Sequence, residues 1–241
     1  MIVSHQKRFV MLLPWKTASQ TIRHRLAPYD AAVYPEFFYF NSYLNRIVHQ
    51  HITCADFVCL PESKLGYFSG TFIRNPYDRV YSGFRQLQTD IELQPRRRYP
   101  VPWIRDLVAR QLAENHSQLQ QAQFQFDDWL KLVGDEQIYE IGRNSNFSLH
   151  PVHYWTHFAG KQLVDFVGRV ETFEEDFKVF LAKVGIDRVE QVNSNVVEIL
   201  GDSNANPFGY RYVNRMNSRS IGRINQLFQT DFEIFGYDRL H

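Results

Sequence analysis

An apolar run that ends at a proline and leads into a loop of cationic and hydroxyl side chains constrains the fold more than any other stretch. The run stops at Pro14, and four of the next seven side chains carry a positive charge or a hydroxyl: Lys16, Thr17, Ser19 and Thr21. Ile22 and Leu26 then follow at the spacing of one helical face. The pattern predicts a strand over 8–13, a tight loop, and a helix over 19–26.

A helix that begins in this way offers a site for a phosphate group. Its first backbone N–H groups have no partner within the helix, and the helix dipole adds a partial positive charge. Lys16 adds a full charge, and the hydroxyls add hydrogen-bond donors. A buried edge strand followed by a Ser/Thr-capped helix explains the same residues, so this stretch alone leaves both interpretations open.

The rest of the chain alternates between strand-like and helix-like patterns. Apolar, β-prone runs predict strands over 32–40, 67–73 and 163–170. Helical spacing predicts helices over 41–50, from 76 onward, and over 103–123, 126–133, 173–184 and 218–232. Strands separated by helices predict an α/β protein, a three-layer α/β/α fold with a central parallel sheet. No repeat or low-complexity linker interrupts the sequence, which predicts a single domain over 1–241.

Two of these helices carry start signals, and one of them follows a cation at a strand end. Asn75 is a good N-cap before Pro76, and Thr172 with Glu175 forms a capping-box pattern. Arg74 follows the strand over 67–73 directly, as Lys16 follows the first strand. Because ligands of parallel sheets bind beyond the carboxyl ends of the strands, we expect Lys16 and Arg74 to face one crevice.

Composition sets the wider limits. The formal net charge of +1 gives no global signal for nucleic acid. Cys54 and Cys59 are the two cysteines, which is no disulfide framework and favours a reducing compartment. No secretory h-region occupies 1–8, and no segment reaches the roughly 20 apolar residues of a membrane span. We therefore expect a cytoplasmic protein without a membrane span.

The loop after Pro14 is not a Walker A motif. It contains a Lys-Thr pair but lacks the glycines of GxxxxGK[ST]. A nucleotide triphosphatase also needs an acidic Mg²⁺ ligand after a strand, whereas Asp165 precedes the core of its strand. A metal-dependent nucleotide triphosphatase is disfavoured but not excluded, and a P-loop-type small-molecule kinase stays as an alternative.

Five segments in order resemble sulfotransferase motifs. Residues 14–21 resemble the 5′-phosphosulfate loop PKTxSTT, and residues 74–84 resemble the 3′-phosphate segment RxPxxRxxSxF. Residues 167–177 resemble a GRxExxxxDF unit, and residues 231–237 resemble the DFExFGY ending of carbohydrate-type members. Residues 48–57 resemble the His-x-His segment of heparan sulfate and chondroitin/dermatan uronyl 2-O-sulfotransferases. The chain departs from the first motif at Trp15 and Gln20.

This resemblance implies a P-loop-like sulfotransferase fold with 3′-phosphoadenosine 5′-phosphosulfate (PAPS) as the donor and no metal. The residues it assigns to the 5′-phosphosulfate are Lys16, Thr17, Ala18, Ser19, Gln20 and Thr21. It assigns Arg74 and Ser82 to the 3′-phosphate, where a guanidinium matches two phosphate oxygens. The implied reaction is in-line transfer of a sulfuryl group to a hydroxyl, with Lys16 stabilising the leaving phosphate. Arg79 has an equally good structural interpretation.

The same resemblance makes His51 the general base and His49 its support. An acceptor hydroxyl needs its proton removed as it attacks, and the reference pKa of histidine, about 6.5, suits that task. The sequence does not decide which of the two is closer to the acceptor. Two ordinary loop histidines are the simpler alternative.

The acceptor is expected to be a carbohydrate hydroxyl, and an oligomer is possible. The loop with Arg96, Arg97 and Arg98 is either solvated or a clamp for an acidic glycan. His150 and His153 line the acceptor side or pack with Trp155. His153 and His157 have zinc-ligand spacing if they lie on a helix, but no accompanying acid or cysteine supports a metal. A non-catalytic nucleotide- or glycan-binding module remains a further alternative.

Overall fold

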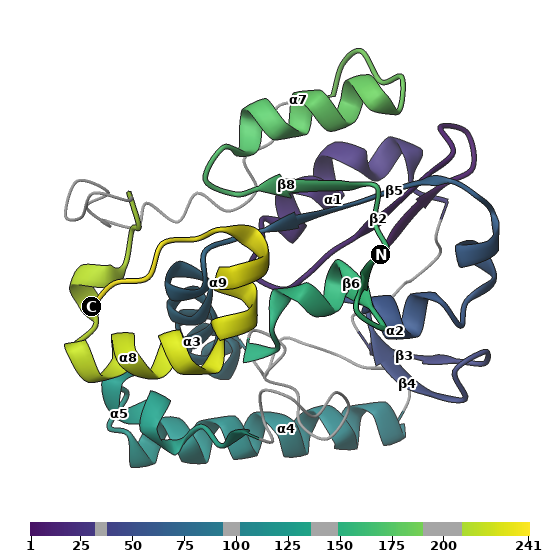
Figure 1. Cartoon of the computed structure of the whole chain (residues 1–241). Helices are drawn as coiled ribbons and strands as arrows, with labels where there is room; N and C mark the ends of the chain where they lie inside the picture. Colours follow the sequence, from purple (N-terminus) through teal and green to yellow (C-terminus); the bar gives the residue numbers. More distant parts are fainter. Residues whose placement is uncertain (32–37, 94–101, 136–148, 190–208) are drawn as a thin grey trace. The chain divides into compact units, whose positions relative to one another are not determined.

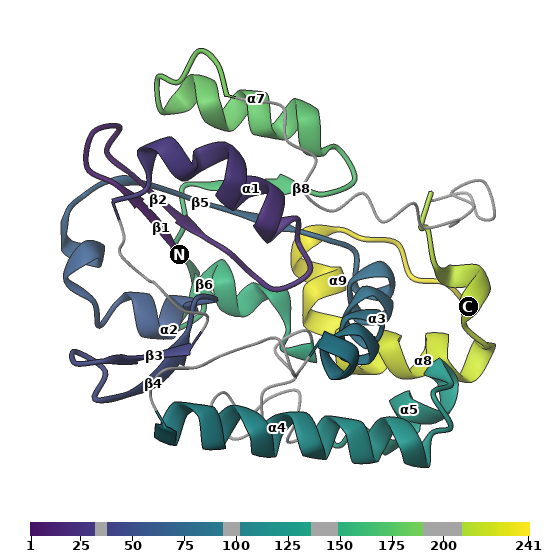
Figure 2. The same cartoon turned by 180° about the vertical axis from the view of Figure 1, so that it is seen from behind.

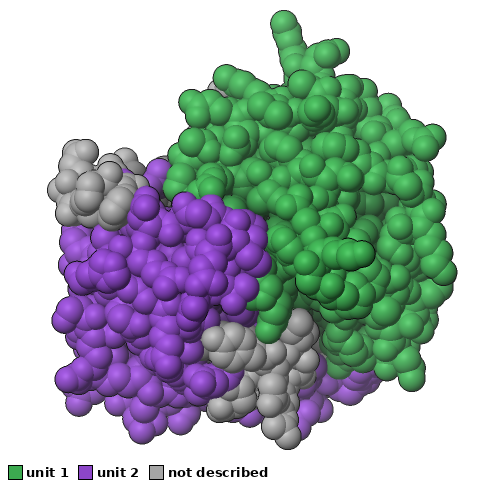
Figure 3. Space-filling view, viewed as in Figure 1, with its two compact units in different colours: residues 1–74, 152–199 green, residues 75–151, 200–241 purple. Residues whose placement is uncertain are grey.

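The computed structural model describes residues 1–31, 38–93, 102–135, 149–189 and 209–241. The chain forms two compact units (Figure 3). Unit 1 contains Met1–Arg74 and Val152–Ile199, and unit 2 contains Asn75–Pro151 and Leu200–His241. The expected loop with Arg96–Arg98 and the first part of the strand predicted over 32–40 lie outside the described residues.

Unit 1 is built on a four-stranded sheet of order β1-β2-β5-β8 (Figure 1). The strands are β1 (Ile2–Ser4), β2 (Phe9–Leu12), β5 (Phe68–Ile73) and β8 (Phe166–Arg169). β1 is antiparallel to β2, whereas β2, β5 and β8 are mutually parallel. The predicted central parallel sheet of an α/β protein is confirmed for β2, β5 and β8, whereas β1 was not predicted and makes the sheet mostly parallel.

Both faces of this sheet are covered, which explains why β2 is apolar at every position. Phe9 and Met11 face helices α1 (Ser19–Leu26) and α7 (Phe173–Lys183), which lie on one side of the strands in both views (Figure 1 and Figure 2). Val10 and Leu12 face the short helix α2 (Cys54–Phe57) and the 3₁₀ turn Val152–Trp155. The sheet is thus the middle layer of unit 1.

The helix predicted over 41–50 is wrong. This segment forms a hairpin of β3 (Phe38–Asn41) and β4 (Arg46–His49). Asn41 closes the turn, because its side-chain oxygen accepts the backbone N–H groups of Tyr43 (3.0 Å) and Leu44 (3.1 Å). These two hydrogen bonds stabilise the turn and favour the hairpin over the helix that the spacing of the following apolar residues predicted.

His153 and His157 do not lie on one helix, which was the condition for their zinc-ligand spacing. His153 lies in the 3₁₀ turn Val152–Trp155, and His157 lies in β6 (His157–Phe158), which pairs with β7 (Lys161–Gln162). The two imidazoles therefore do not lie one turn apart on a helix.

Unit 2 is helical in its described part. Its helices are α3 (Pro76–Leu93), α4 (Pro102–Gln121), α5 (Phe126–Leu132), α8 (Ser218–Leu227) and α9 (Gln229–Phe235). The first three match the predicted helices closely. The single helix predicted over 218–232 is wrong, because Phe228 leaves the helical conformation (φ −114°) and buries its ring 5.7 Å from the guanidinium carbon of Arg79.

The helix-start signals had different outcomes. Asn75 caps α3 as predicted, and its side-chain oxygen accepts the backbone N–H of Asp78 at 2.8 Å. Thr172 precedes α7 but makes no side-chain cap. Its hydroxyl donates instead to Asp176 (2.8 Å), which also accepts the backbone N–H of Arg169. The predicted box with Glu175 is therefore replaced by a bond that ties the end of β8 to α7.

A close approach inside unit 1 gives a stability prediction. A Cβ at Gly168 would lie 2.5 Å from a ring carbon of the fully buried Phe72. Gly168→Ala should therefore lower the free energy of unfolding by about 2 kcal/mol through overpacking, measured by urea denaturation. Gly222→Ala in α8 meets nothing within 4 Å and should raise it by about 0.5–1 kcal/mol. Equal effects of the two substitutions would contradict this packing.

Candidate functional site

The loop between β2 and α1 is held in a strained conformation. Lys16 (φ 64°) and Ala18 (φ 60°) are both left-handed, although neither is glycine. Each such residue costs about 1–2 kcal/mol, and strain of this kind clusters at binding and catalytic sites. A left-handed residue beside a right-handed one turns successive N–H groups toward one point, an arrangement that binds anions.

Short polar contacts brace this loop. The buried hydroxyl of Thr17 donates to the Pro14 carbonyl at 2.9 Å, and Ile22 N–H donates to the Ala18 carbonyl at 3.0 Å. Helix α1 begins at Ser19 without a side-chain cap and without an acidic residue in its first turn. Nothing in that first turn therefore opposes the binding of an anion at the N-terminus of α1.

The sheet register brings three cations to one edge. Ile73 pairs with Arg169, so β5 and β8 end level with each other, and β2 ends at Leu12, which pairs with Thr71 two residues before the end of β5. Lys16 and Arg74 follow β2 and β5 beyond the carboxyl ends of these strands, and the expectation that both face one crevice stays a prediction. Arg169 ends the third strand and was not singled out from the sequence, because only the pairing shows that it shares the edge.

The other predicted phosphate contacts are less uniform. Ser19 is buried, Thr21 is half-buried and Gln20 is exposed on the first turn of α1. Ser82 is buried in α3, which belongs to unit 2. The joint action of Ser82 and Arg74 on one phosphate stays a prediction.

His51 is attached to the start of the same loop. Its Nδ1 lies 2.5 Å from the carbonyl oxygen of Leu13, the residue before Pro14. Because a carbonyl only accepts, Nδ1 carries the proton and Nε2 carries the lone pair. The Trp15 ring is stacked on the imidazole, with centroids 6.3 Å apart. The structure therefore brings His51 together with the predicted phosphate loop.

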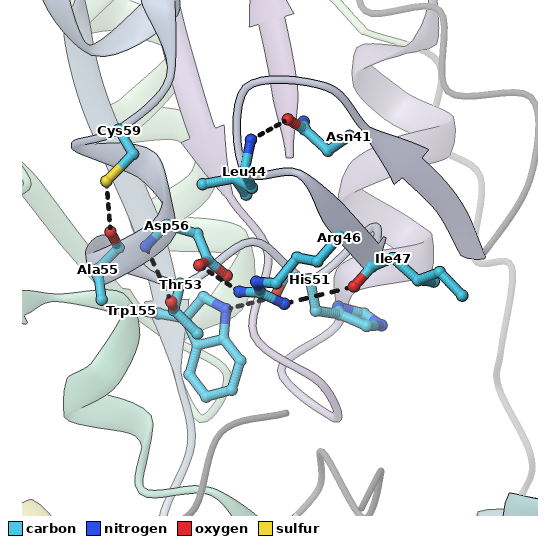
Figure 4. Close-up of polar contacts among 10 residues, drawn as sticks. All are labelled: Asn41, Leu44, Arg46, Ile47, His51, Thr53, Ala55, Asp56, Cys59 and Trp155. Carbon is cyan, nitrogen blue, oxygen red and sulfur yellow. Dashed lines mark hydrogen bonds and ion pairs between the residues drawn. The ribbon is translucent and has the colours of Figure 1, made fainter. Parts of the chain in front are cut away.

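Neighbouring groups fix the position of this histidine. Trp155 Nε1 donates to the His51 carbonyl oxygen at 3.2 Å (Figure 4). The backbone N–H of His51 donates to Nδ1 of His49 at 2.9 Å, and the two ring centroids are 5.6 Å apart. His49 is thus a support for His51 through a defined bond.

Burial lowers the pKa of His51 to about 3, and the Leu13 carbonyl opposes this shift. The positive charges of the N-terminus, Arg23 and Lys16 lower the pKa of His51 further. Burial also lowers the pKa of Arg23, whose guanidinium lies 3.8 Å from Asp30. Arg23 was not singled out from the sequence either. At neutral pH the imidazole of His51 is uncharged.

Arg79, which the sequence left open between a functional and a structural role, makes contacts typical of a structural residue. Arg79 is fully buried in unit 2 and donates to the carbonyl oxygen of His150, consistent with its structural interpretation.

Among the described residues, no group of three or more His, Cys, Asp or Glu side chains is placed to hold a metal ion. In the same part of the chain, no helix combines the length and the apolar character that crossing a bilayer requires.

The central, mostly parallel sheet with helices packed on it defines an α/β protein. The family model described as "Sulfotransferase family" matches residues 2–238, so the chain belongs to the sulfotransferase family. This confirms the resemblance to sulfotransferases found in the sequence motifs, whereas the likeness of residues 48–57 to the uronyl 2-O-sulfotransferases stays a prediction.

Curated proteins similar to this chain are named carbohydrate sulfotransferases. The chain is 25% identical to carbohydrate sulfotransferase 10 of Gallus gallus over 187 residues, 71% of this chain and 47% of that protein. It is 24% identical to carbohydrate sulfotransferase 10 of Homo sapiens over 188 residues, 72% of this chain and 48% of that protein. The chain spans about half the length of these relatives. No solved structure matches it.

The lowered pKa of His51 predicts a specific loss of stability in acid. Below a pH of about 6.5 the unfolded chain binds a proton at this residue, whereas the folded protein does so only near pH 3. Stability should fall by about 1.4 kcal/mol per pH unit in this window, or about 2 kcal/mol between pH 7 and pH 5.

His51→Asn isolates this contribution, because its amide keeps a donor toward Leu13 but does not titrate. Urea unfolding at several pH values should show a shallower pH dependence in the variant than in the wild type. Identical pH dependences would show that His51 does not titrate as its burial requires.

Proposed function

We propose that the protein transfers a sulfuryl group from PAPS to a carbohydrate hydroxyl by in-line displacement. One observation carries the proposal: the candidate base His51 is hydrogen-bonded to Leu13, and the loop of Lys16 begins at the next residue. A proton acceptor and an anion-binding loop thus share one support at the carboxyl end of β2.

The donor nucleotide is held at its two ends. Lys16, the loop amides and the hydroxyls of Ser19 and Thr21 take the 5′-phosphosulfate at the N-terminus of α1. Arg74 takes the 3′-phosphate. The two cations lie beyond neighbouring parallel strands, whose carboxyl ends form one edge. This spacing supports a ligand with two separate anionic groups.

Transfer moves negative charge onto the oxygen that bridges sulfur and the 5′-phosphate. Lys16 stabilises that oxygen as the bond to sulfur breaks, because a positioned cation acts most strongly where charge develops. The strained loop contributes here as well, since amides already in position need no reorganisation during the reaction.

His51 accepts the proton of the attacking hydroxyl at Nε2. Its low pKa keeps Nε2 unprotonated but makes it a weak base, since a base works best with a pKa near the working pH. The anionic donor compensates the charges of Lys16 and Arg23, which raises the pKa of His51 when the donor is bound. His49 orients the segment by accepting the His51 N–H.

The acceptor class comes from the relatives, which are named carbohydrate sulfotransferases. The particular glycan, a cytoplasmic location and independence from metal ions stay predictions. A P-loop kinase is disfavoured further by Asp165. This acid accepts from the backbone N–H and the hydroxyl of Ser69, at the start of β5, so it lies at the opposite end of the strands from Lys16.

His51→Asn tests the base. Loss of a general base lowers turnover by roughly 10²–10⁴-fold, whereas binding of 3′-phosphoadenosine 5′-phosphate (PAP) should change little. Transfer of labelled sulfate to a glycan panel gives the rate, and isothermal titration calorimetry gives PAP affinity. Wild-type turnover in the variant would reject His51 as the base. PAP binding by the wild type with no transfer to any hydroxyl would favour the non-catalytic module.

Lys16→Met tests the cation at the bridging oxygen. Removing a group that stabilises developing charge should lower kcat by about 10²–10³-fold, while chelation with EDTA should leave the rate unchanged. Lys64→Met replaces an exposed lysine of the same unit and serves as the matched control. A rate that falls equally in both variants, or that depends on Mg²⁺, would contradict the mechanism.

A further inference from the structure

The β3–β4 hairpin has one face packed on the core of unit 1 and one face turned away from it. Side chains alternate between faces along a strand, and directly paired residues share a face. Tyr39 pairs with Val48, and both belong to the apolar cluster that also contains Trp155. The opposite face, called here the outward face, carries two other cross-strand pairs: Phe38 with His49 and Phe40 with Ile47.

The hairpin is anchored beside its turn. Arg46, which pairs with Asn41 next to the turn, forms an ion pair with Asp56 of α2, and Asn41 closes the turn onto Leu44 (Figure 4). The inward-facing Val48 is almost completely buried. The outward face is therefore presented on a fixed support, which reduces the entropy lost when a ligand binds.

The outward face runs from the candidate site to an exposed aromatic end. At one end Phe38 is buried, and its ring meets that of His49 edge to face, with centroids 6.4 Å apart. At the other end Phe40 is 48% exposed, and Tyr43 at the turn is 68% exposed. Isolated exposed apolar residues need no explanation, but here two aromatic residues stand at the end of a strip that begins at a candidate catalytic residue.

The chemistry of the hairpin suits an uncharged, ring-shaped ligand. Residues 38–49 contain no Asp or Glu, and their one cation, Arg46, is engaged by Asp56. Exposed amide and hydroxyl groups stand beside Tyr43, on Ser42 and Asn45. A pyranose ring has a C–H face that packs on an aromatic ring and hydroxyls that bond to such groups.

We propose that the outward face, through Phe40 and Tyr43, is a subsite for a sugar ring of the acceptor glycan. The inference deepens the proposed function and rests on it, because the strip leads to His49 beside the base. The ring bound there is a neighbour of the residue that receives the sulfuryl group. It is recognised by its C–H face and not by charge.

The size of the face argues against a protein partner. A two-stranded ribbon of four residues per strand is about 14 Å long and about 10 Å wide. This area is far below the roughly 800 Å² per partner of a stable protein interface, but it accommodates one or two sugar rings.

Phe40→Ala tests the subsite with three hexasaccharide probes: N-acetylheparosan, chondroitin and cellohexaose. Binding is measured by isothermal titration calorimetry in the presence of PAP, and transfer is measured with labelled PAPS. We expect the Kd and KM of at least one hexasaccharide to rise roughly tenfold, the effect of losing one good anchor side chain, with kcat unchanged. The loss should be the same at low and high salt, because no charge is involved.

Two variants and one small probe make the result specific. Phe40→Trp keeps an aromatic surface and should retain binding. Phe124→Ala removes a phenylalanine that is 43% exposed in unit 2 and should have no effect. A methyl glycoside of a single sugar occupies only the reacting position, so Phe40→Ala should not change its KM.

Unchanged hexasaccharide binding in Phe40→Ala, or a wild type that binds none of the probes, would overturn the subsite. A wild-type dimer in sedimentation velocity that Phe40→Ala dissociates would overturn it in favour of self-association. Weakened binding in a protein whose wild type transfers no sulfate would support the subsite and reject the proposed reaction. Sulfate transfer that is insensitive to Phe40 would reject the subsite alone.

Discussion

The hydrogen bond from His51 Nδ1–H to the Leu13 carbonyl is the constraint on which the site depends. It joins the segment after β4 to the last residue before the phosphate loop, 38 positions away in sequence. The bond fixes the tautomer of the imidazole and leaves Nε2 as its only acceptor. The same carbonyl opposes the lowering of the pKa by burial, so it supports the residual basicity of the ring.

The central sheet determines where the cationic residues lie relative to its strands. β2 is buried on both faces, so its direction and register are set by packing against two helices on one side and a 3₁₀ turn and hairpin on the other. Parallel pairing with β5 and β8 then delivers Lys16, Arg74 and Arg169 to one edge. Two left-handed residues without glycine show that the loop is held in place by its surroundings, because such strain persists only where the fold enforces it.

Much of the fold could be predicted because its signals are local. The strand over 8–13, the helix from Ser19 and the Asn75 cap each depend on neighbouring residues, and the parallel sheet was predicted from the alternation of strands and helices. The hairpin at 38–49 could not be predicted, because Leu44, Ile47 and Val48 also match helical spacing, and only pairing with Phe38–Asn41 selects the strand. The break at Phe228 depends on a ring buried against Arg79, a contact between distant residues.

The candidate site was predicted only in part, because only some of its residues have a local signature in the sequence. Motif resemblance pointed to Lys16 and His51, and the structure joins them through Leu13. Arg169 and Arg23 were missed, because an arginine at a strand end or on a helix has no local signature of function. Their significance depends on strand register and on the field that acts on a buried imidazole.

The most direct measurement of the central claim is the ¹⁵N NMR spectrum of the His51 imidazole, recorded with and without PAP. The account predicts a neutral ring protonated at Nδ1 in both states, with an Nε2 resonance that shifts when PAP binds beside Lys16. A ring protonated at Nε2, or a resonance that PAP leaves unchanged, would contradict the placement of a base beside the phosphate loop.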